Sequence, residues 1–233
     1  MRLLCMIPGR GGSKRVRSKN TLPLCGKPLI SYSIIAAKEA GVFEDSDIVV
    51  STDTEEISRI ASDYGVSCDL RPGDLGGDRV RVVQVIEEYL KREESHRRYD
   101  AVVTLLPTCP LRTAEDVRKA VELFSAQDEP GKSLVGVVHY EFPPQLALVR
   151  TGDETVRMEF PEAYARTTRS QDIAPRYHAM GAIYIATIDY FVRTGTYFQE
   201  EMLAYEMPRE SAIDIDYSYQ FKIAEELMRA REG

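Results

Sequence analysis

The stretch "LLCMIPGRGGSKR", residues 3–15, decides the fold, because a continuous apolar run passes directly into glycines and cations. The run "LLCMIP" predicts a strand buried on both faces, as in a parallel sheet covered by helices. Gly9, Gly11 and Gly12 then allow a turn whose backbone N–H groups can approach an anion closely. Ligands of open parallel sheets bind at the carboxyl ends of the strands. The sequence therefore predicts a ligand site directly after the first strand.

Positive charge and a hydroxyl accompany these glycines. Arg10, Lys14, Arg15 and Lys19 supply the charge, and Ser13 supplies the hydroxyl donor. The segment matches neither the P-loop pattern GxxxxGK[ST] nor the dinucleotide pattern GxGxxG. We interpret it as a phosphate cradle, and the alternative is a flexible basic loop on the surface.

Strand and helix patterns alternate over the first 138 residues. The predicted strands are 3–8, 47–53, 100–107 and 133–138, and the predicted helices are 28–41, 54–65, 80–94 and 113–127. Thr113 and Asp116 have the spacing of a helix N-cap. The alternation predicts an α/β fold of three layers, Rossmann-like, with a mostly parallel sheet. A length of 233 residues suits a single domain, 1–233, with a sizeable excursion.

The pattern changes over residues 139–178, which are rich in Pro, Tyr and Arg. Within them, "QLALVRTGDETVRMEF" predicts a hairpin turning at Gly152 and Asp153. We interpret 139–178 as an excursion from the sheet, either a lid or an oligomerisation (dimerisation) arm. Beyond it we expect a strand and a helix over 181–195, a strand over 210–216 and a closing helix from 217.

Composition excludes several classes of protein. A net charge of −7 argues against a general nucleic-acid binder but leaves room for a local basic pocket. No apolar run approaches the ~20 residues of a membrane helix, and the N-terminus lacks the apolar core of a signal peptide. The cysteines are widely spaced, without a CxxC pair, and are interpreted as reduced thiols of a cytoplasmic protein: Cys5, Cys25, Cys68 and Cys109.

The second candidate site is "IDID", residues 213–216. If these residues form a strand, Asp214 and Asp216 face the same side. Two adjacent carboxylates repel unless a cation lies between them, and Mg²⁺ shared with a nucleotide phosphate meets that need. The alternative is a solvated strand end with two ordinary acids.

Further polar segments follow predicted strands and are expected at the same rim of the sheet. They are "STD" at 51–53 and "LLPTCPLRT" at 105–113. Arg71 and Asp78 are further candidates to line the rim. Each is typical of a loop when taken alone, and it is their convergence on one edge that favours a site.

Seven motifs occur in the order and spacing of one known family: "IPGRGGSKRVRSKN", "GKPLISYSI", "VVSTDTEEI", "LRPGDL", "PTCPLRTAEDV", "GAIYI" and "IDID". Over residues 3–228 the chain resembles the acylneuraminate cytidylyltransferases, which are CMP-sialic acid synthetases and relatives acting on other nonulosonic acids. The resemblance implies a glycosyltransferase-A-like nucleotidyltransferase fold. It also implies transfer of CMP from CTP to the anomeric hydroxyl of a 2-keto sugar acid, with Mg²⁺ as cofactor and a homodimer as the assembly.

The resemblance, together with position in the sequence, assigns roles to individual residues. The expected nucleotide-binding residues are Arg10, Gly11, Gly12, Ser13, Lys19, Asn20, Arg71 and Asp78. The expected sugar-binding residues are Leu106, Thr108, Arg112, Arg169 and Gln171. Asp214 and Asp216 are the expected metal ligands. Arg10 and Lys19 are expected to act with them in catalysis, by neutralising the charge that develops on the phosphates.

The chain departs from the family pattern on the sugar side. Leu106 stands where the family usually has glutamine, Cys109 where it has serine, and Met180 where it tends to have asparagine. We therefore hypothesise a nonulosonic acid other than N-acetylneuraminic acid, such as a deaminated sialic acid, pseudaminic acid or legionaminic acid. Two alternatives stay open: another sugar-nucleotide pyrophosphorylase of this fold, or a non-catalytic nucleotide-binding module. Retention of both Asp214 and Asp216 argues against the second.

Overall fold

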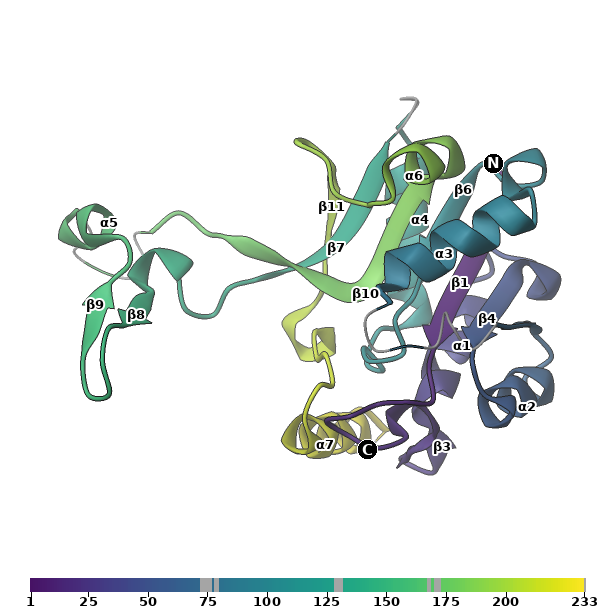
Figure 1. Cartoon of the computed structure of the whole chain (residues 1–233), viewed down its shortest axis with the longest axis horizontal. Helices are drawn as coiled ribbons and strands as arrows, with labels where there is room; N and C mark the ends of the chain where they lie inside the picture. Colours follow the sequence, from purple (N-terminus) through teal and green to yellow (C-terminus); the bar gives the residue numbers. More distant parts are fainter. Residues whose placement is uncertain (72–76, 78–79, 128–131, 167–168, 170–172, 233) are drawn as a thin grey trace.

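A seven-stranded sheet forms the centre of the molecule, in the order β11-β7-β10-β6-β1-β4-β5 (Figure 1). The computed structural model describes residues 1–71, 77, 80–127, 132–166, 169 and 173–232. The strands of this sheet are β1 Leu3–Gly9, β4 Ile48–Thr52, β5 Ser67–Leu70, β6 Ala101–Thr104, β7 Ser133–His139, β10 Tyr177–Thr187 and β11 Leu203–Glu206. β10 runs antiparallel to β6 and β7, and the other pairs are parallel. The prediction of a mostly parallel sheet is confirmed.

Helices cover both faces of the sheet, which gives the predicted three layers. One face carries α1 Leu29–Glu39, α2 Glu55–Asp63 and α4 Ala114–Ser125, and the other carries α3 Val82–Arg92 and α6 Ile188–Thr194. Successive residues of β1 enter different apolar clusters, since Ile7 packs with Ile34 on one face and Met6 packs with Ile86 on the other. The run "LLCMIP" is apolar throughout because both faces of its strand are buried. In the described part of the chain, no helix has the length and apolar character to span a membrane.

Short elements connect these layers and close the chain. They are η1 Lys19–Thr21, β2 Pro23–Leu24, β3 Lys27–Pro28, η2 Asp45–Asp47, η4 Ser95–Arg97, η5 Pro144–Leu146 and η7 Arg209–Ser211, followed by α7 Ser218–Glu232. Leu24 and Leu29 pack with Ala224 of α7 in a third apolar cluster. This cluster brings the C-terminal helix to the segment that follows β1, and Figure 1 shows the two side by side.

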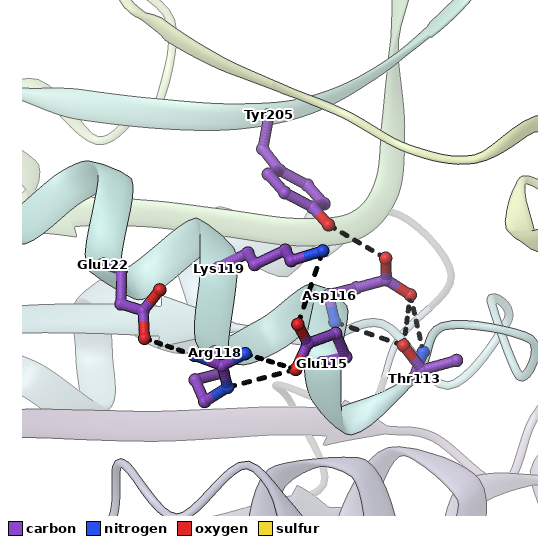
Figure 2. Close-up of polar contacts among 7 residues, drawn as sticks. All are labelled: Thr113, Glu115, Asp116, Arg118, Lys119, Glu122 and Tyr205. Atoms are coloured by element: carbon purple, nitrogen blue, oxygen red, sulfur yellow. Dashed lines mark hydrogen bonds and ion pairs between the residues drawn. The ribbon is translucent and has the colours of Figure 1, made fainter.

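A capping box fixes the start of α4, as the spacing of Thr113 and Asp116 predicts (Figure 2). Thr113 Oγ1 accepts from the backbone N–H of Asp116 at 3.1 Å, and Asp116 Oδ2 accepts from the backbone N–H of Thr113 at 2.8 Å. Tyr205 of β11 donates its hydroxyl to Asp116 Oδ1 at 2.9 Å. Figure 2 also shows ion pairs on the exposed face, among Glu115, Arg118, Lys119 and Glu122. The cap anchors the loop that joins β6 to α4.

The strand predicted over 210–216 is wrong. The structure has the short η7 at Arg209–Ser211 and no strand over the rest of this described segment. The alternation in "IDID" arises because Ile215 is buried with Leu29 and Leu111. The backbone N–H of Ile215 donates to the Thr108 carbonyl at 2.8 Å and ties the segment to the loop after β6. The short strands β5 and β11 were not predicted.

Residues 140–176, called the arm below, leave the sheet between β7 and β10. The predicted hairpin is present, because β8 Leu148–Arg150 pairs antiparallel with β9 Val156–Met158. The helix α5, Pro161–Ala165, follows it. Figure 1 shows the arm projecting from the body of the molecule. All residues of β8 and β9 are exposed, so the arm has no core of its own at this hairpin.

Candidate functional site

A cleft of about 740 Å³ opens at the carboxyl ends of the central strands. The loop after β1 forms one wall, with charged and polar side chains between residues 8 and 20. Arg71 follows β5, and the start of α3 adds Val82 and Val85. Residues 106–108, after β6, and Asp216 also belong to the described lining, as do Gly77, Val80 and Arg81. The cleft is therefore cationic on one side and largely aliphatic on another.

Close packing explains two of the three glycines after β1. A Cβ atom on Gly9 would lie 2.5 Å from Ile30 Cδ1, and one on Gly11 would lie 2.3 Å from Thr54 Cγ2. The backbone N–H of Gly11 donates to Asp53 Oδ1 at 2.8 Å. A Cβ on Gly12 would meet no atom within 4 Å, so packing does not require glycine there.

Asn20 and Arg71 hold the beginning of the same loop. Asn20 Nδ2 donates to the Arg10 carbonyl at 2.8 Å, and Arg71 Nη2 donates to the Gly9 carbonyl at 3.4 Å. Arg71 is buried, and burial lowers its pKa, while the charges of Asp53 and Asp69 oppose that shift. Its Nε has no hydrogen-bond partner in the described structure. Because a buried unpaired donor is costly in free energy, a ligand that accepts a hydrogen bond from Arg71 Nε would remove that cost.

The two ends of the chain meet at Asp216. Arg15 Nη1 lies 2.8 Å from Asp216 Oδ2, and Lys19 Nζ lies 3.4 Å from Asp216 Oδ1. Lys19 also donates to the Ile215 carbonyl. The backbone N–H groups of Asp216 and Tyr217 both donate to Gln220 Oε1 at 2.8 Å, which fixes Asp216 at the start of α7. The cationic loop and the acidic segment thus form one site.

Asp214 lies close to this group, although it is not part of the described cleft lining. Desolvation raises the pKa of Asp214, and the hydrogen bond from Thr108 opposes that effect. The negative charge of Asp216 raises the pKa further, while the charge of Lys19 lowers it. A cation bound beside Asp214 would favour its charged form.

The donor set fits Mg²⁺ as a site shared between protein and nucleotide. Carboxylate oxygens are ligands that Mg²⁺ prefers, and in proteins the ion usually takes one or two carboxylates together with substrate phosphates. Among the described residues, no group of three or more His, Cys, Asp and Glu side chains is placed to hold a metal. If such an ion binds here, Asp214 and Asp216 would supply only part of its coordination shell.

The expected sugar-side residues fall into different places. Leu106 and Thr108 line the cleft. Arg112 is buried and does not belong to the described lining: it donates from Nη1 to the Ala182 carbonyl at 2.6 Å and to the Leu106 carbonyl at 3.3 Å. Its Nη2 donates to Ser33 Oγ at 2.5 Å. The structure thus places Arg112 outside the described lining, although it was expected to face the sugar. Its hydrogen bond to the Leu106 carbonyl supports the loop that contains Leu106.

The remaining predicted residues are distributed as follows. The described cleft lining includes Arg10, Ser13, Lys19, Asn20, Arg71, Leu106, Thr108 and Asp216. Arg169 is exposed on the arm and is not part of this lining. Asp78 and Gln171 lie outside the described residues. Sequence reasoning assigned no role to Arg81 or Val85, which lie at the start of the amphipathic helix α3.

Comparison with known proteins agrees with this geometry. A family model described as "Cytidylyltransferase" matches residues 4–232. The chain is 36% identical over 236 positions to the CMP-N,N'-diacetyllegionaminic acid synthase of Legionella pneumophila, covering 100% of this chain and 98% of the relative. It is 34% identical over 218 positions to the pseudaminic acid cytidylyltransferase of Campylobacter jejuni, covering 93% and 91%.

A second group of relatives is longer than this chain. An N-acylneuraminate cytidylyltransferase of Streptococcus agalactiae is 33% identical over 216 positions, which cover 93% of this chain and 51% of the relative. The chain thus spans about half the length of the N-acylneuraminate cytidylyltransferases that it matches.

Solved structures share the fold. The CMP:2-keto-3-deoxy-manno-octonic acid synthetase complexed with CTP superimposes with a TM-score of 0.71 at 15% identity, covering 99% of this chain and 100% of that chain. The 4-diphosphocytidyl-2C-methyl-D-erythritol synthase of Anaerococcus prevotii superimposes with a TM-score of 0.65 at 11% identity, covering 98% of both chains. These likenesses confirm the predicted nucleotidyltransferase architecture.

Proposed function

Because the chain belongs to the cytidylyltransferase family, we propose that it transfers CMP from CTP to a nonulosonic acid and releases pyrophosphate. One observation carries the proposal: Lys19 and Asp216, 197 residues apart in sequence, are in contact at the cleft. That contact unites a cationic loop with carboxylates at the strand ends where nucleotides bind in this class of fold.

Charge stabilisation explains how the cleft would promote this reaction. The anomeric hydroxyl oxygen of the sugar acid attacks the α-phosphorus of CTP, and the bond to the departing pyrophosphate breaks. Negative charge grows on the phosphoryl oxygens, and Arg10 and Lys19 are placed to oppose it. Asp214 and Asp216 would hold Mg²⁺, which when bound neutralises phosphate charge and acidifies the attacking hydroxyl.

The aliphatic side of the cleft supports a substrate other than N-acetylneuraminic acid. Leu106 packs over Gly181 so closely that a Cβ atom there would lie 2.6 Å from Leu106 Cδ1. With Val82 and Val85 nearby in the lining, this side offers little hydrogen bonding to a polar substituent. Two of the relatives matched over nearly their full length are named for pseudaminic and legionaminic acids. We propose a substrate of that deoxy, diamino class.

A panel of sugar acids tests both the proposed transfer reaction and the proposed substrate class. The protein is incubated with CTP, Mg²⁺ and each of four acids: N-acetylneuraminic, deaminated sialic, pseudaminic and N,N'-diacetyllegionaminic. Pyrophosphate release and product mass are measured. We expect CMP-sugar to form fastest with a diamino acid. In the matched variant Leu106→Gln, we expect the preference over N-acetylneuraminic acid to shrink by about tenfold, the size of a one-group change in a pocket.

Two results of this panel would contradict the proposal at different levels. Fastest turnover on N-acetylneuraminic acid would refute the substrate class but leave the reaction intact. Absence of any CMP-sugar, with every acid and with other nucleoside triphosphates, would refute the transferase itself.

We further propose that the protein is a homodimer assembled through the arm. Phe142 is 80% exposed and Phe160 is 49% exposed, and Leu148, Val156 and Tyr164 of the arm are also largely exposed. Exposed apolar surface of this kind marks interaction sites.

Measurement of the mass in solution tests the assembly. We expect twice the chain mass of 26.3 kDa for the wild type. The double variant Phe142→Ser with Phe160→Ser should be a monomer. Phe198→Ser, which removes from the body a ring about as exposed as that of Phe160, should stay dimeric. A wild-type monomer at micromolar concentration would refute the dimer.

A cytoplasmic location is also proposed. All four cysteines are free thiols in the structure, which is typical of a reducing compartment. Cell fractionation tests this, and recovery of the protein with a secreted or membrane fraction would refute it.

A further inference from the structure

Both carboxylate oxygens of Asp216 are engaged by cations. Arg15 Nη1 contacts Oδ2 at 2.8 Å, and Lys19 Nζ approaches Oδ1 at 3.4 Å. The environments of the two cations differ, since the Lys19 side chain is 11% exposed and the Arg15 side chain is 59% exposed. Lys19 is also held by the Ile215 carbonyl. Arg15 is therefore the partner that can leave Asp216 more easily.

A metal ion on Asp216 would compete with Arg15 for the same oxygen. Like charges at such short range repel, so a divalent cation and a guanidinium do not share one carboxylate oxygen without cost. The ion pair itself is exposed to water, and exposed pairs contribute little to stability. The geometry therefore permits an exchange of partners at small energetic cost.

Arg15 has a second contact that keeps it in the cleft. Its guanidinium lies over the ring of Tyr217, 5.1 Å from the ring centroid, and a cation in this position is attracted to the aromatic face. Arg15 also belongs to the cleft lining, together with Arg10 and Ser13 of the same loop. A guanidinium recognises phosphate oxygens with two parallel hydrogen bonds.

From these contacts we propose that Arg15 is a triphosphate-binding residue that exchanges Asp216 for nucleotide phosphate. The exchange would leave the Asp216 carboxylate available to a metal ion, so that nucleotide binding and metal binding would support each other. Lys19 stays at Ile215 throughout, and Tyr217 guides Arg15 between its two partners. This inference rests on the proposed use of CTP.

A double-mutant cycle on nucleotide binding tests the exchange. The dissociation constant of CTP is measured in EDTA by equilibrium dialysis for the wild type, Arg15→Gln, Asp216→Asn and the double variant. In the absence of metal, Asp216→Asn should tighten binding by about 2- to 5-fold, because Arg15 loses its competing anion. Arg15→Gln should weaken binding by a similar factor. In the Arg15→Gln background, the gain from Asp216→Asn should shrink at least twofold.

Three variants separate the exchange from a general charge effect. Asp214→Asn removes an equal charge nearby without touching Arg15, so its effect should be the same in both Arg15 backgrounds. Arg17→Gln removes an exposed charge of the same loop outside the cleft lining and should leave the dissociation constant within twofold. Arg15→Lys, which keeps the charge but loses the paired hydrogen bonds, should fall between wild type and Arg15→Gln. Thermal unfolding checks that each variant is folded.

The outcomes separate this inference from the function on which it rests. Equal gains from Asp216→Asn with and without Arg15 would overturn the exchange while leaving CTP binding established. Failure of the wild type to bind CTP, with or without Mg²⁺, would overturn both. The exchange is supported if the effects of substituting Arg15 and Asp216 on the CTP dissociation constant depend on each other, while the effect of Asp214→Asn is the same in both Arg15 backgrounds.

Discussion

An aspartate contacts an arginine beside a tyrosine at each end of the parallel strands. The two aspartates, Asp47 and Asp216, differ in burial. At the amino ends, Asp47 is 2% exposed; Arg2 donates to both of its oxygens at 3.1 Å, and Tyr99 donates to Oδ1 at 2.8 Å. At the carboxyl ends, the Asp216 side chain is 48% exposed. The arginines are alike, since the Arg2 side chain is 53% exposed and the Arg15 side chain 59%, so the difference lies in the aspartates. The buried group is fixed, whereas the exposed group is free to exchange partners.

The pKa shifts of nearby acids reflect this difference. Burial alone would raise the pKa of Asp47, but the hydrogen bonds from Arg2 and Tyr99 outweigh it, and the pKa is lowered. At the cleft, desolvation dominates at Asp214 and its pKa is raised. The donors at the amino ends thus stabilise the charged form of a buried carboxylate, whereas at Asp214, beside the cleft, a bound cation would be needed to favour the charged form.

The largest effect expected from this comparison is on turnover. Asp216→Asn should lower kcat by about 100- to 1000-fold, because it removes a carboxylate that would hold Mg²⁺ at the phosphates. It should change the free energy of unfolding by less than about 0.5 kcal/mol, since the side chain is half exposed. Pyrophosphate release and urea unfolding measure the two quantities. Retention of more than a tenth of the turnover would contradict the role of Asp216.

A smaller effect, on stability alone, is expected at the other end of the strands. Asp47→Asn should lower the free energy of unfolding by about 1–3 kcal/mol at pH 7. The neutral amide accepts weaker hydrogen bonds from Arg2 and Tyr99 than the buried carboxylate does. Turnover should stay within twofold of wild type, because Asp47 lies at the amino ends of the strands and the cleft lies at their carboxyl ends.

The pH dependence of this loss follows from the direction of the shift. The pKa of Asp47 is lower in the folded than in the unfolded protein, so its stabilisation is complete above the ordinary aspartate pKa of about 4. The stabilisation is lost as the pH falls through the folded value. Urea unfolding of both proteins should show the gap narrowing below about pH 4, and a gap independent of pH would contradict the account.

The same contrast shows which parts of the molecule were predictable from sequence. The first strand and the cap of α4 depend on local patterns, namely a fully apolar run and the Thr113–Asp116 spacing. The cations of the cleft were found because they directly follow a buried strand. Local pattern decides these features, so sequence alone gives them.

Features set by distant contacts were missed. Arg112 has the right position in sequence for the cleft, yet its guanidinium donates to the carbonyls of Leu106 and Ala182 in the interior. The segment 210–216 alternates like a strand, but the burial of Ile215 causes that alternation and no neighbouring strand pairs with it. The direction of a side chain depends on tertiary partners that no local pattern specifies.

Transfer of label from CTP carrying ³²P in the α-phosphate tests the central claim most directly. With Mg²⁺ and N,N'-diacetyllegionaminic acid, the account predicts that the label appears in a CMP-sugar, with one pyrophosphate released for each label transferred. It also predicts that Asp216→Asn abolishes most of this transfer while Asp47→Asn preserves it. Label that stays in CTP, or that leaves as free CMP regardless of the sugar acid, would contradict the claim.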